Sequence, residues 1–234
     1  MDTPPKNVLI VSLTASQAQR NCPDCMQIGG SISGLMHGVV LRSLGYNVHI
    51  LEAREPEALK AEAGGLSLGP QALELVETFL PHVAPFMIPS THTQFLGADE
   101  KLFREIPIAF PVEITGWNLL FDRLKAAFLE ENGRKGSGRY DTGRRVTDVS
   151  DLGQSVAVTL EGISNNSLEA DLVIAADGGR SVLRSKSLPD CAPVYAGYIA
   201  WRGCVPEASV PDVLGGAFEG KLLMHLGENN YILA

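Results

Sequence analysis

The sequence has 234 residues, of which 45% are hydrophobic and 20% are charged, and its net charge is −8. These values are typical of a soluble globular protein with room for one large domain or two small ones. The acidic balance, without a basic block, argues against nucleic acid and anionic membranes as partners. No apolar run reaches the roughly 18 residues of a membrane span, and the start lacks a secretion signal. We therefore expect a cytoplasmic protein with no membrane partner.

The first apolar run is residues 7–11, NVLIV, which is short enough for a buried parallel strand. In a dinucleotide-binding unit such a strand enters a glycine-rich turn directly. Here the polar, aperiodic residues 12–27 stand between the run and the turn, where the fold normally tolerates only a few residues. The strand and its turn are therefore predicted to be interrupted.

Residues 11–27 have the features of a non-native insertion. Removing them joins the flanking residues into KNVLI-IGGSISGL, an uninterrupted strand and turn. Val-Ser can be encoded by GTGAGT, a common splice-donor sequence, and Gln by CAG, which ends like a splice acceptor. We hypothesise that the segment is a translated intron, to be set aside from fold reasoning as other processing scars are.

Cys22 and Cys25 form a C-x-x-C pair inside this segment. Such a pair can be a redox motif or half of a zinc site, but no second pair of ligands completes a metal site. An accidental pair in a loop is the alternative that we favour. Cys191 and Cys204 are isolated and are interpreted as packing residues, and four cysteines in a chain of this length do not indicate a disulfide framework.

The glycine-rich turn at residues 29–34 is followed by an amphipathic helix and an acid-terminated strand. The helix has Ile32, Leu35, Val39 and Leu44 on one face and should end at Gly45. The next strand runs through residues 48–51 to an acidic residue 18 positions after the last turn glycine, near the spacing expected of a ribose-binding carboxylate. Together these features predict a dinucleotide-binding unit, with an ordinary helix start as the alternative.

The turn residues that would face a diphosphate are Gly29, Gly30, Ser31 and Gly34, and the acid is Glu52. Glycines let backbone N–H groups approach the diphosphate, and the helix N-terminus adds partial positive charge. Ser31 stands where the G-x-G-x-x-G pattern has its middle glycine, and its hydroxyl could donate to a phosphate.

Several further elements follow in the chain. Residues 64–66 contain two glycines and read either as a turn or as a place where backbone approaches a ligand. A helix is predicted from Pro70 to Phe79, a hairpin over residues 93–108 and a second helix over residues 117–128. Residues 130–138 are predicted to be a polar loop.

Strands dominate the remainder of the sequence. Residues 144–149 and 155–160 alternate and are joined by a DLGQ turn, and residues 171–176 form an apolar run that ends in Asp177-Gly178. A buried strand that delivers Asp-Gly at its carboxyl end is a natural ligand position, although a plain turn is equally compatible. Arg180 and Arg184 begin a short helix. Residues 198–205, 222–226 and 231–233 are predicted to be strands.

The sequence resembles FAD-dependent aromatic-ring monooxygenases of the para-hydroxybenzoate hydroxylase group. Three patches carry this resemblance: IGGSISGL through HILEAR, DLVIAADGGRSVLR, and YAGYIAWRGCVPE. The third patch looks like the branch that includes 2,6-dihydroxypyridine 3-monooxygenase. The resemblance covers nearly the whole chain apart from residues 11–27.

The resemblance implies an α/β fold, with a three-layer Rossmann-like FAD-binding domain and part of a β-rich substrate domain. The first would comprise residues 1–70 and 109–188, and the second residues 71–108 and 189–234. A later segment of the family that contacts the flavin is absent, so the chain is expected to be a truncated member.

The resemblance also implies roles for individual residues. Glu52 would hold the adenosine ribose with Ala53 and Arg54 beside it, and Gly65 would lie near the flavin through its backbone. Val146 would reach the adenine through its backbone. The remaining cofactor contacts implied are those of Gly29, Gly30, Ser31, Gly34, Asp177 and Gly178. Trp117 falls where relatives often have an arginine facing FAD, so that contact is not expected here.

The implied activity is NADPH-dependent hydroxylation of a small aromatic or heteroaromatic substrate with O₂. The chemistry is carried by the cofactor, so no side chain is predicted as a catalytic acid or base and no metal is expected. Two alternatives remain: a non-catalytic fragment with impaired FAD binding, and a nicotinamide-dependent reductase that uses Glu52 for NAD.

Overall fold

The computed structural model describes residues 24–60, 64–80, 86–131, 136–162, 167–203, 205–211 and 220–234. They form two compact units, the first comprising Met1–Ala61 and Leu124–Tyr198 and the second Glu62–Arg123 and Ile199–Ala234. No helix in these ranges is long and apolar enough to cross a membrane.

The first unit contains a parallel sheet and an antiparallel sheet. The parallel sheet has the order β10-β1-β2-β6, and the antiparallel sheet has the order β7-β8-β9. The strands are β1 (Asp24–Ile28), β2 (Asn47–Leu51), β6 (Gly138–Asp141), β7 (Val146–Asp151), β8 (Val156–Leu160), β9 (Ser167–Ala170) and β10 (Leu172–Ala175). The helices are α1 (Ile32–Ser43), α2 (Pro56–Lys60), η2 (Gly178–Arg180) and α5 (Val182–Ser187).

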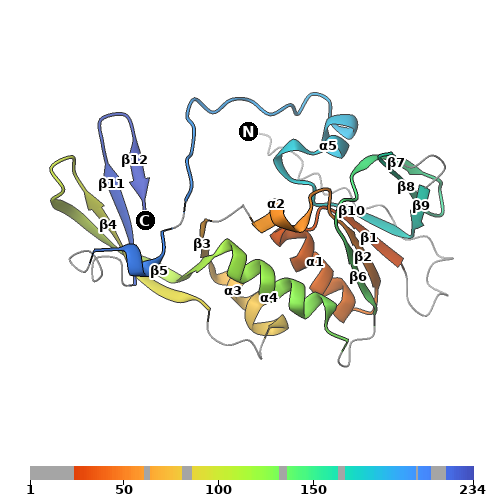
Figure 1. Ribbon diagram of the computed structural model, residues 1–234, viewed down its shortest axis with the longest axis horizontal. Coiled ribbons are helices and arrows are strands. Elements are labelled where there is room, and N and C mark those ends of the chain that lie inside the picture. The colour runs from red at the N-terminus through yellow and green to blue at the C-terminus, as the bar shows by residue number, and fades with distance from the viewer. Residues whose placement is uncertain are drawn as a thin grey trace, which may run out of the picture. The chain divides into compact units, whose positions relative to one another are not determined.

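The parallel sheet lies between α1 on one face and the antiparallel sheet on the other (Figure 1). Met26 and Ile28 of β1 pack with Leu51, Val158 and Leu183 in a buried cluster on the antiparallel-sheet side. On the other face, Gly38 of α1 lies so close to Ile50 and Phe128 that an added Cβ would stand 3.1 Å and 2.9 Å from them. This arrangement confirms the predicted three-layer α/β fold.

The second unit is a five-stranded sheet in the order β12-β11-β4-β5-β3, accompanied by α3. Its elements are β3 (Gly65–Leu68), α3 (Pro70–Phe79), β4 (Ile88–Leu96), β5 (Leu102–Gly116), η3 (Glu207–Ser209), β11 (Lys221–Leu226) and β12 (Tyr231–Leu233). The helix α4 (Trp117–Leu129) is continuous across the boundary between the units.

The unit boundaries differ from the expected domain boundaries at residues 70, 108 and 188. The reason is a pairing that the sequence pattern did not reveal: β3 pairs antiparallel with the end of β5, Gly65 opposite Gly116. Residues around 65–70 and 109–116 therefore belong to the same sheet as the predicted hairpin.

Several predicted elements are confirmed. Gly45 has a φ of 97° and donates its amide to the Arg42 carbonyl, as a helix-terminating glycine does. The helix at residues 70–79, the hairpin of β4 and β5, and the hairpin of β7 and β8 lie where the patterns placed them.

Other expectations were wrong. Leu44 lies beyond the end of α1 and is 68% exposed, because the helix ends one residue earlier. Residues 198–203, expected to begin a strand, have no regular structure and are exposed. The supposed loop up to residue 138 leads into β6, which was not predicted.

The first strand of the parallel sheet is also not the expected one. Residues 7–11 lie outside the described residues, and the strand that enters the glycine turn is Asp24–Ile28, which includes residues 24–27 of the supposed insertion. Chain connectivity explains the difference, because the strand that pairs with β2 must end directly at Gly29. With residues 11–27 present, only the residues just before Gly29 can occupy that place.

This strand carries a buried polar side chain. Gln27 is fully buried; in the orientation that satisfies its amide, it donates to the Gly34 carbonyl and accepts from the Gly38 amide at 3.1 Å. Deleting residues 11–27 places the predicted run directly before Ile28, so that Ile10 takes the position of Gln27. An apolar residue then replaces an amide at the centre of the sheet.

We expect deletion of residues 11–27 to raise the melting temperature by about 3 °C or more, because the strand before Ile28 then reads NVLI in place of DCMQ and buries more apolar surface. This gain is opposed by the loss of the two hydrogen bonds of Gln27, at about 1 kcal/mol each. Circular dichroism melts of the two chains measure this. Gln27→Ile gains apolar burial but loses both hydrogen bonds to α1, so it should raise the melting temperature less than the deletion does, whereas Gln71→Ile on the exposed face of α3 should change it little. A deletion variant that melts lower than the parent chain would contradict the insertion hypothesis.

Burial also determines the reactivity of Cys25. It lies on β1 with 1% exposure, and desolvation raises its thiol pKa to about 12. A thiol in this state is a poor nucleophile, because the thiolate is the reactive form. This disfavours the redox interpretation of the C-x-x-C pair.

Cys191 is exposed, so its interpretation as a packing residue was wrong. We expect Cys25 to resist alkylation by iodoacetamide at pH 8 in the folded protein, while Cys191 is labelled readily. Tandem mass spectrometry of the labelled peptides distinguishes the two sites. Labelling in guanidinium chloride is the control, since both thiols should then react. Rapid labelling of Cys25 in the folded chain would contradict its placement on a buried strand.

Candidate functional site

The candidate site is built where β1, β2 and β10 end side by side. Ile28 pairs with Leu51 on one side and with Ala175 on the other, and all three strands run parallel. Their carboxyl ends therefore lie at one edge of the sheet, where open α/β sheets bind ligands. The chain segments that leave this edge carry the glycine turn, Glu52 and Asp177.

The glycine turn is bound to both neighbouring strands through the backbone. Ala176 donates its amide to the Ile28 carbonyl at 2.7 Å, and Gly29 donates to the Leu51 carbonyl at 2.9 Å. Gly29 has a φ of 102°, and an added Cβ would collide with the Ala176 carbonyl. Only glycine satisfies both conditions, so the turn requires glycine here independently of any ligand.

The first turn of α1 presents donors without a side-chain cap. Ser31 is the N-cap residue, its hydroxyl makes no capping bond, and no acidic residue lies in the first helical turn. A Cβ at Gly34 would collide with the Gly29 carbonyl, so the turn closes tightly over the helix start. Uncapped N–H groups and the helix dipole make this end of α1 suited to an anion.

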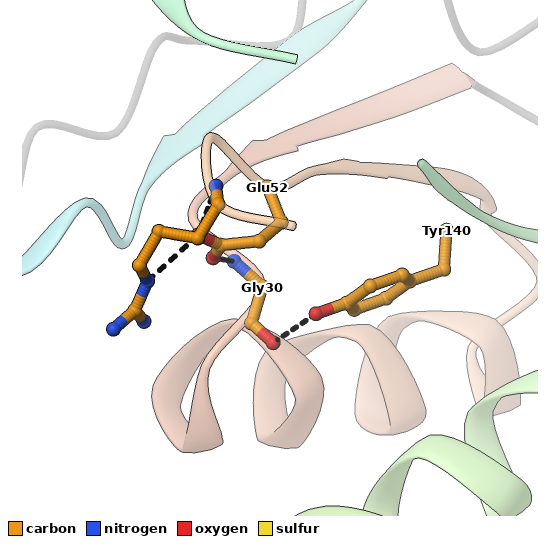
Figure 2. Close-up of polar contacts among 4 residues, drawn as sticks. Gly30, Glu52 and Tyr140 are labelled. Carbon is orange, nitrogen blue, oxygen red and sulfur yellow. Dashed lines mark hydrogen bonds and ion pairs between the residues drawn. The ribbon is translucent and has the colours of Figure 1, made fainter. Parts of the chain in front are cut away.

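Glu52 follows β2 and is 4% exposed. One carboxylate oxygen accepts from the Gly30 amide at 2.8 Å (Figure 2), and the other accepts from the Arg54 amide at 2.9 Å and from Arg54 Nε at 3.1 Å. A carboxylate has about four acceptor sites, so three of them are used and one is left for a further donor.

The residues expected beside the ribose and adenine lie in the same neighbourhood. Ala53 and Arg54 directly follow Glu52. Arg144 donates its amide to the Glu52 carbonyl at 2.8 Å, and Val146 begins β7 two residues later with its side chain in the buried cluster. The structure thus brings Val146 near Glu52 through the backbone.

Asp177 lies just beyond the end of β10, half-buried, and one of its carboxylate oxygens accepts from the Val182 amide at 3.1 Å. Gly178 has a φ of 78°, and an added Cβ would meet no atom within 4 Å. Arg184 holds this loop by donating to the carbonyls of Gly178 and Gly179. The predicted Asp-Gly pair therefore lies at the same sheet edge as the glycine turn.

Two further residues belong to elements outside this neighbourhood. Gly65 begins β3 of the second unit, and an added Cβ there meets nothing within 4 Å. Trp117 begins α4, donates its amide to the Gly64 carbonyl at 2.8 Å and stacks on Phe121 with ring centroids 4.8 Å apart. Gly65 and Trp117 both belong to the second unit, and no described hydrogen bond or ring contact joins either of them to the glycine turn.

Tyr140 is a site residue that the sequence analysis missed. It lies on β6, next to β2, and its hydroxyl donates to the Gly30 carbonyl at 2.7 Å (Figure 2). In the sequence, Tyr140 is marked only by its place in β6, the strand that follows a glycine-containing loop. This strand has four residues, too few for its periodicity to be recognised. Its role is recognisable only from the sheet order.

The comparisons with known proteins agree with this geometry. No family model matches the chain. Over 209 residues it is 28% identical to the 2,6-dihydroxypyridine 3-monooxygenase of Paenarthrobacter nicotinovorans, covering 88% of this chain and 49% of the relative. Over 229 residues it is 27% identical to the FAD-dependent monooxygenase pigN of Monascus ruber, covering 90% of this chain and 50% of the relative.

A solved structure shows the same relationship. The structure of 2,6-dihydroxypyridine-3-hydroxylase from Arthrobacter nicotinovorans matches with a TM-score of 0.74 at 27% identity, over 90% of this chain and 51% of that one. The chain spans about half the length of the curated relatives that it matches. These findings confirm the resemblance seen in the sequence: the chain is similar to FAD-dependent aromatic-ring monooxygenases and has the fold of that solved structure over the length that it spans.

Proposed function

We propose that the chain acts as a FAD-dependent monooxygenase that consumes NAD(P)H and O₂ to hydroxylate a small aromatic or heteroaromatic molecule. The observation that carries this proposal is the meeting of the glycine turn, Glu52 and Asp177 at one edge of a parallel sheet. The relatives whose names describe a FAD-dependent monooxygenase and a dihydroxypyridine monooxygenase support the cofactor and the substrate class.

The residues present are compatible with the adenosine diphosphate half of FAD. The uncapped start of α1 and the Ser31 hydroxyl offer donors to a diphosphate, and no acidic side chain opposes one in the first turn. Glu52 retains acceptor capacity for a ribose hydroxyl after its three bonds to Gly30 and Arg54. In this proposal Val146 reaches the adenine, and Asp177 and Gly178 contact the ribityl and diphosphate region.

The protein's own contribution to the reaction is binding and orientation. When bound, the flavin would supply the redox chemistry of O₂ activation and ring hydroxylation. Glu52 would fix the ribose and the first turn of α1 would fix the diphosphate, which together set where the isoalloxazine ring lies. Gly65 would approach the flavin through its backbone, and the five-stranded sheet would contribute to the substrate site.

The reductant, the domain roles and the location complete the proposal. Asp177 would also serve nicotinamide binding, with NADPH as the reductant. The unit with the parallel sheet would form the FAD domain and the unit with the five-stranded sheet the substrate part, which moves residues 65–70 and 109–116 from the expected FAD domain to the substrate part. The proposed location is the cytoplasm.

The proposal is tested by adding FAD to the purified chain and measuring binding from the quenching of flavin fluorescence. We expect the bound flavin to co-elute with the protein on gel filtration, detected by its absorption band at about 450 nm. NADPH-dependent O₂ uptake with dihydroxypyridines or hydroxybenzoates then measures activity. Binding of FAD without O₂ uptake would indicate a non-catalytic fragment, and binding of NADH in place of FAD would indicate a reductase.

Glu52→Ala should weaken FAD binding by about 10- to 100-fold, because a hydrogen bond to a charged group contributes roughly 1.5–3 kcal/mol. Glu57→Ala is the matched control, since Glu57 is an exposed acid on the nearby α2. The dissociation constants of both variants are measured by the same titration. Equal affinities for the two variants would show that Glu52 does not contact the cofactor.

A further inference from the structure

Gly30 is held at its amide by Glu52, which directly follows β2, and at its carbonyl by Tyr140 of β6. Its amide donates to the Glu52 carboxylate at 2.8 Å, and its carbonyl accepts from the Tyr140 hydroxyl at 2.7 Å. Figure 2 shows the two contacts reaching Gly30 from different directions, at the start of α1. The two peptide planes on either side of the Gly30 Cα are therefore both fixed.

The Tyr140 side chain is itself firmly placed. Its backbone pairs with Ile50 in the sheet, and the Lys125 ammonium lies 4.3 Å from the centre of its ring. A Cβ added to Gly30 would stand 2.5 Å from the Tyr140 hydroxyl oxygen and 2.7 Å from the adjoining ring carbon. The ring thus occupies the space beside Gly30, which requires a residue without a side chain.

The hydroxyl contact determines where the next amide points. A trans peptide unit is planar, and its C=O and N–H point in opposite directions. Because Tyr140 holds the Gly30 carbonyl on the β6 side, the Ser31 N–H is directed away from β6. Within the described part of the chain this N–H has no acceptor, and Ser31 is the N-cap of α1.

We propose that Tyr140 is a positioning residue of the diphosphate site, which aims the Ser31 N–H at the diphosphate by holding the Gly30 carbonyl. This inference rests on the proposed binding of FAD and assigns Tyr140 a part in it. Tyr140 acts through the backbone and does not itself touch the diphosphate. A hydroxyl held this way preorganises the donor before the ligand arrives, which lowers the cost of binding.

Tyr140 remains a donor over the working pH range. Burial raises its pKa well above the usual value, the negative charge of Glu52 raises it further, and Arg54 opposes this effect. The hydroxyl therefore stays protonated at neutral and moderately alkaline pH, and its bond to the Gly30 carbonyl persists there.

The test compares three ligands in the wild-type chain and in Tyr140→Phe, which keeps the ring and removes only the hydroxyl. FAD affinity is measured by fluorescence quenching, and the affinities for ADP and adenosine by displacement of FAD. We expect about fivefold weaker binding of FAD and ADP, as for the loss of one hydrogen bond, and less than a twofold change for adenosine, which has no phosphate. Tyr231→Phe, at an exposed tyrosine of β12, should change none of the three affinities.

Two results would overturn the inference. One is unchanged affinity for FAD and ADP in Tyr140→Phe, and the other is an equal loss for all three ligands, which would indicate a general structural effect. A melting temperature within about 2 °C of the wild-type value shows that the fold is kept. If the wild-type chain binds neither FAD nor ADP, the proposed function itself fails, whereas binding that is insensitive to Tyr140 removes only this inference.

Discussion

The pairing of β1 with β2 on one side and with β10 on the other is the constraint on which the site depends. Because the three strands are parallel and in register, their ends converge on the turn that begins at Gly29. Two backbone hydrogen bonds then join the turn to both neighbours, and the Ala176 carbonyl comes so close that no side chain fits at Gly29. Close packing of the backbone therefore requires glycine at position 29 whether or not a ligand binds. The turn leads directly into the uncapped start of α1.

The side chains around the turn extend this rigidity to the polar groups. Glu52 is buried yet accepts three hydrogen bonds, so its charge is compensated by Gly30 and Arg54 without a ligand. Glu52 directly follows β2, Tyr140 lies on β6 beyond it, and both bind Gly30. The sheet thus sets the geometry of these polar groups, and they are oriented without a ligand.

The sequence predicted those features that depend on local chemistry. Gly45 as a helix end, Glu52 at a strand end and the helix from Pro70 follow from residue type and periodicity, and the structure confirms them. The features that were missed depend on neighbours distant in the chain. Residues 198–203 have a strand-like pattern, yet no described strand pairs with them, and β6 is a four-residue strand defined only by its pairing with β2. The strand that leads into Gly29 is Asp24–Ile28, which connectivity rather than hydrophobicity selects, whereas residues 7–11 lie outside the described residues.

The interleaved path of the chain has a consequence for biosynthesis. The parallel sheet of the first unit takes β1 from near residue 24 and β10 from near residue 172, with most of the second unit between them. A ribosome adds roughly 5–20 residues per second, so the emerging β1 waits about 7–30 seconds for one of its two partners. During that interval one edge of β1, four of whose five residues are buried in the folded protein, is open to other chains, and yield in the cell should depend on chaperones that shield nascent strands.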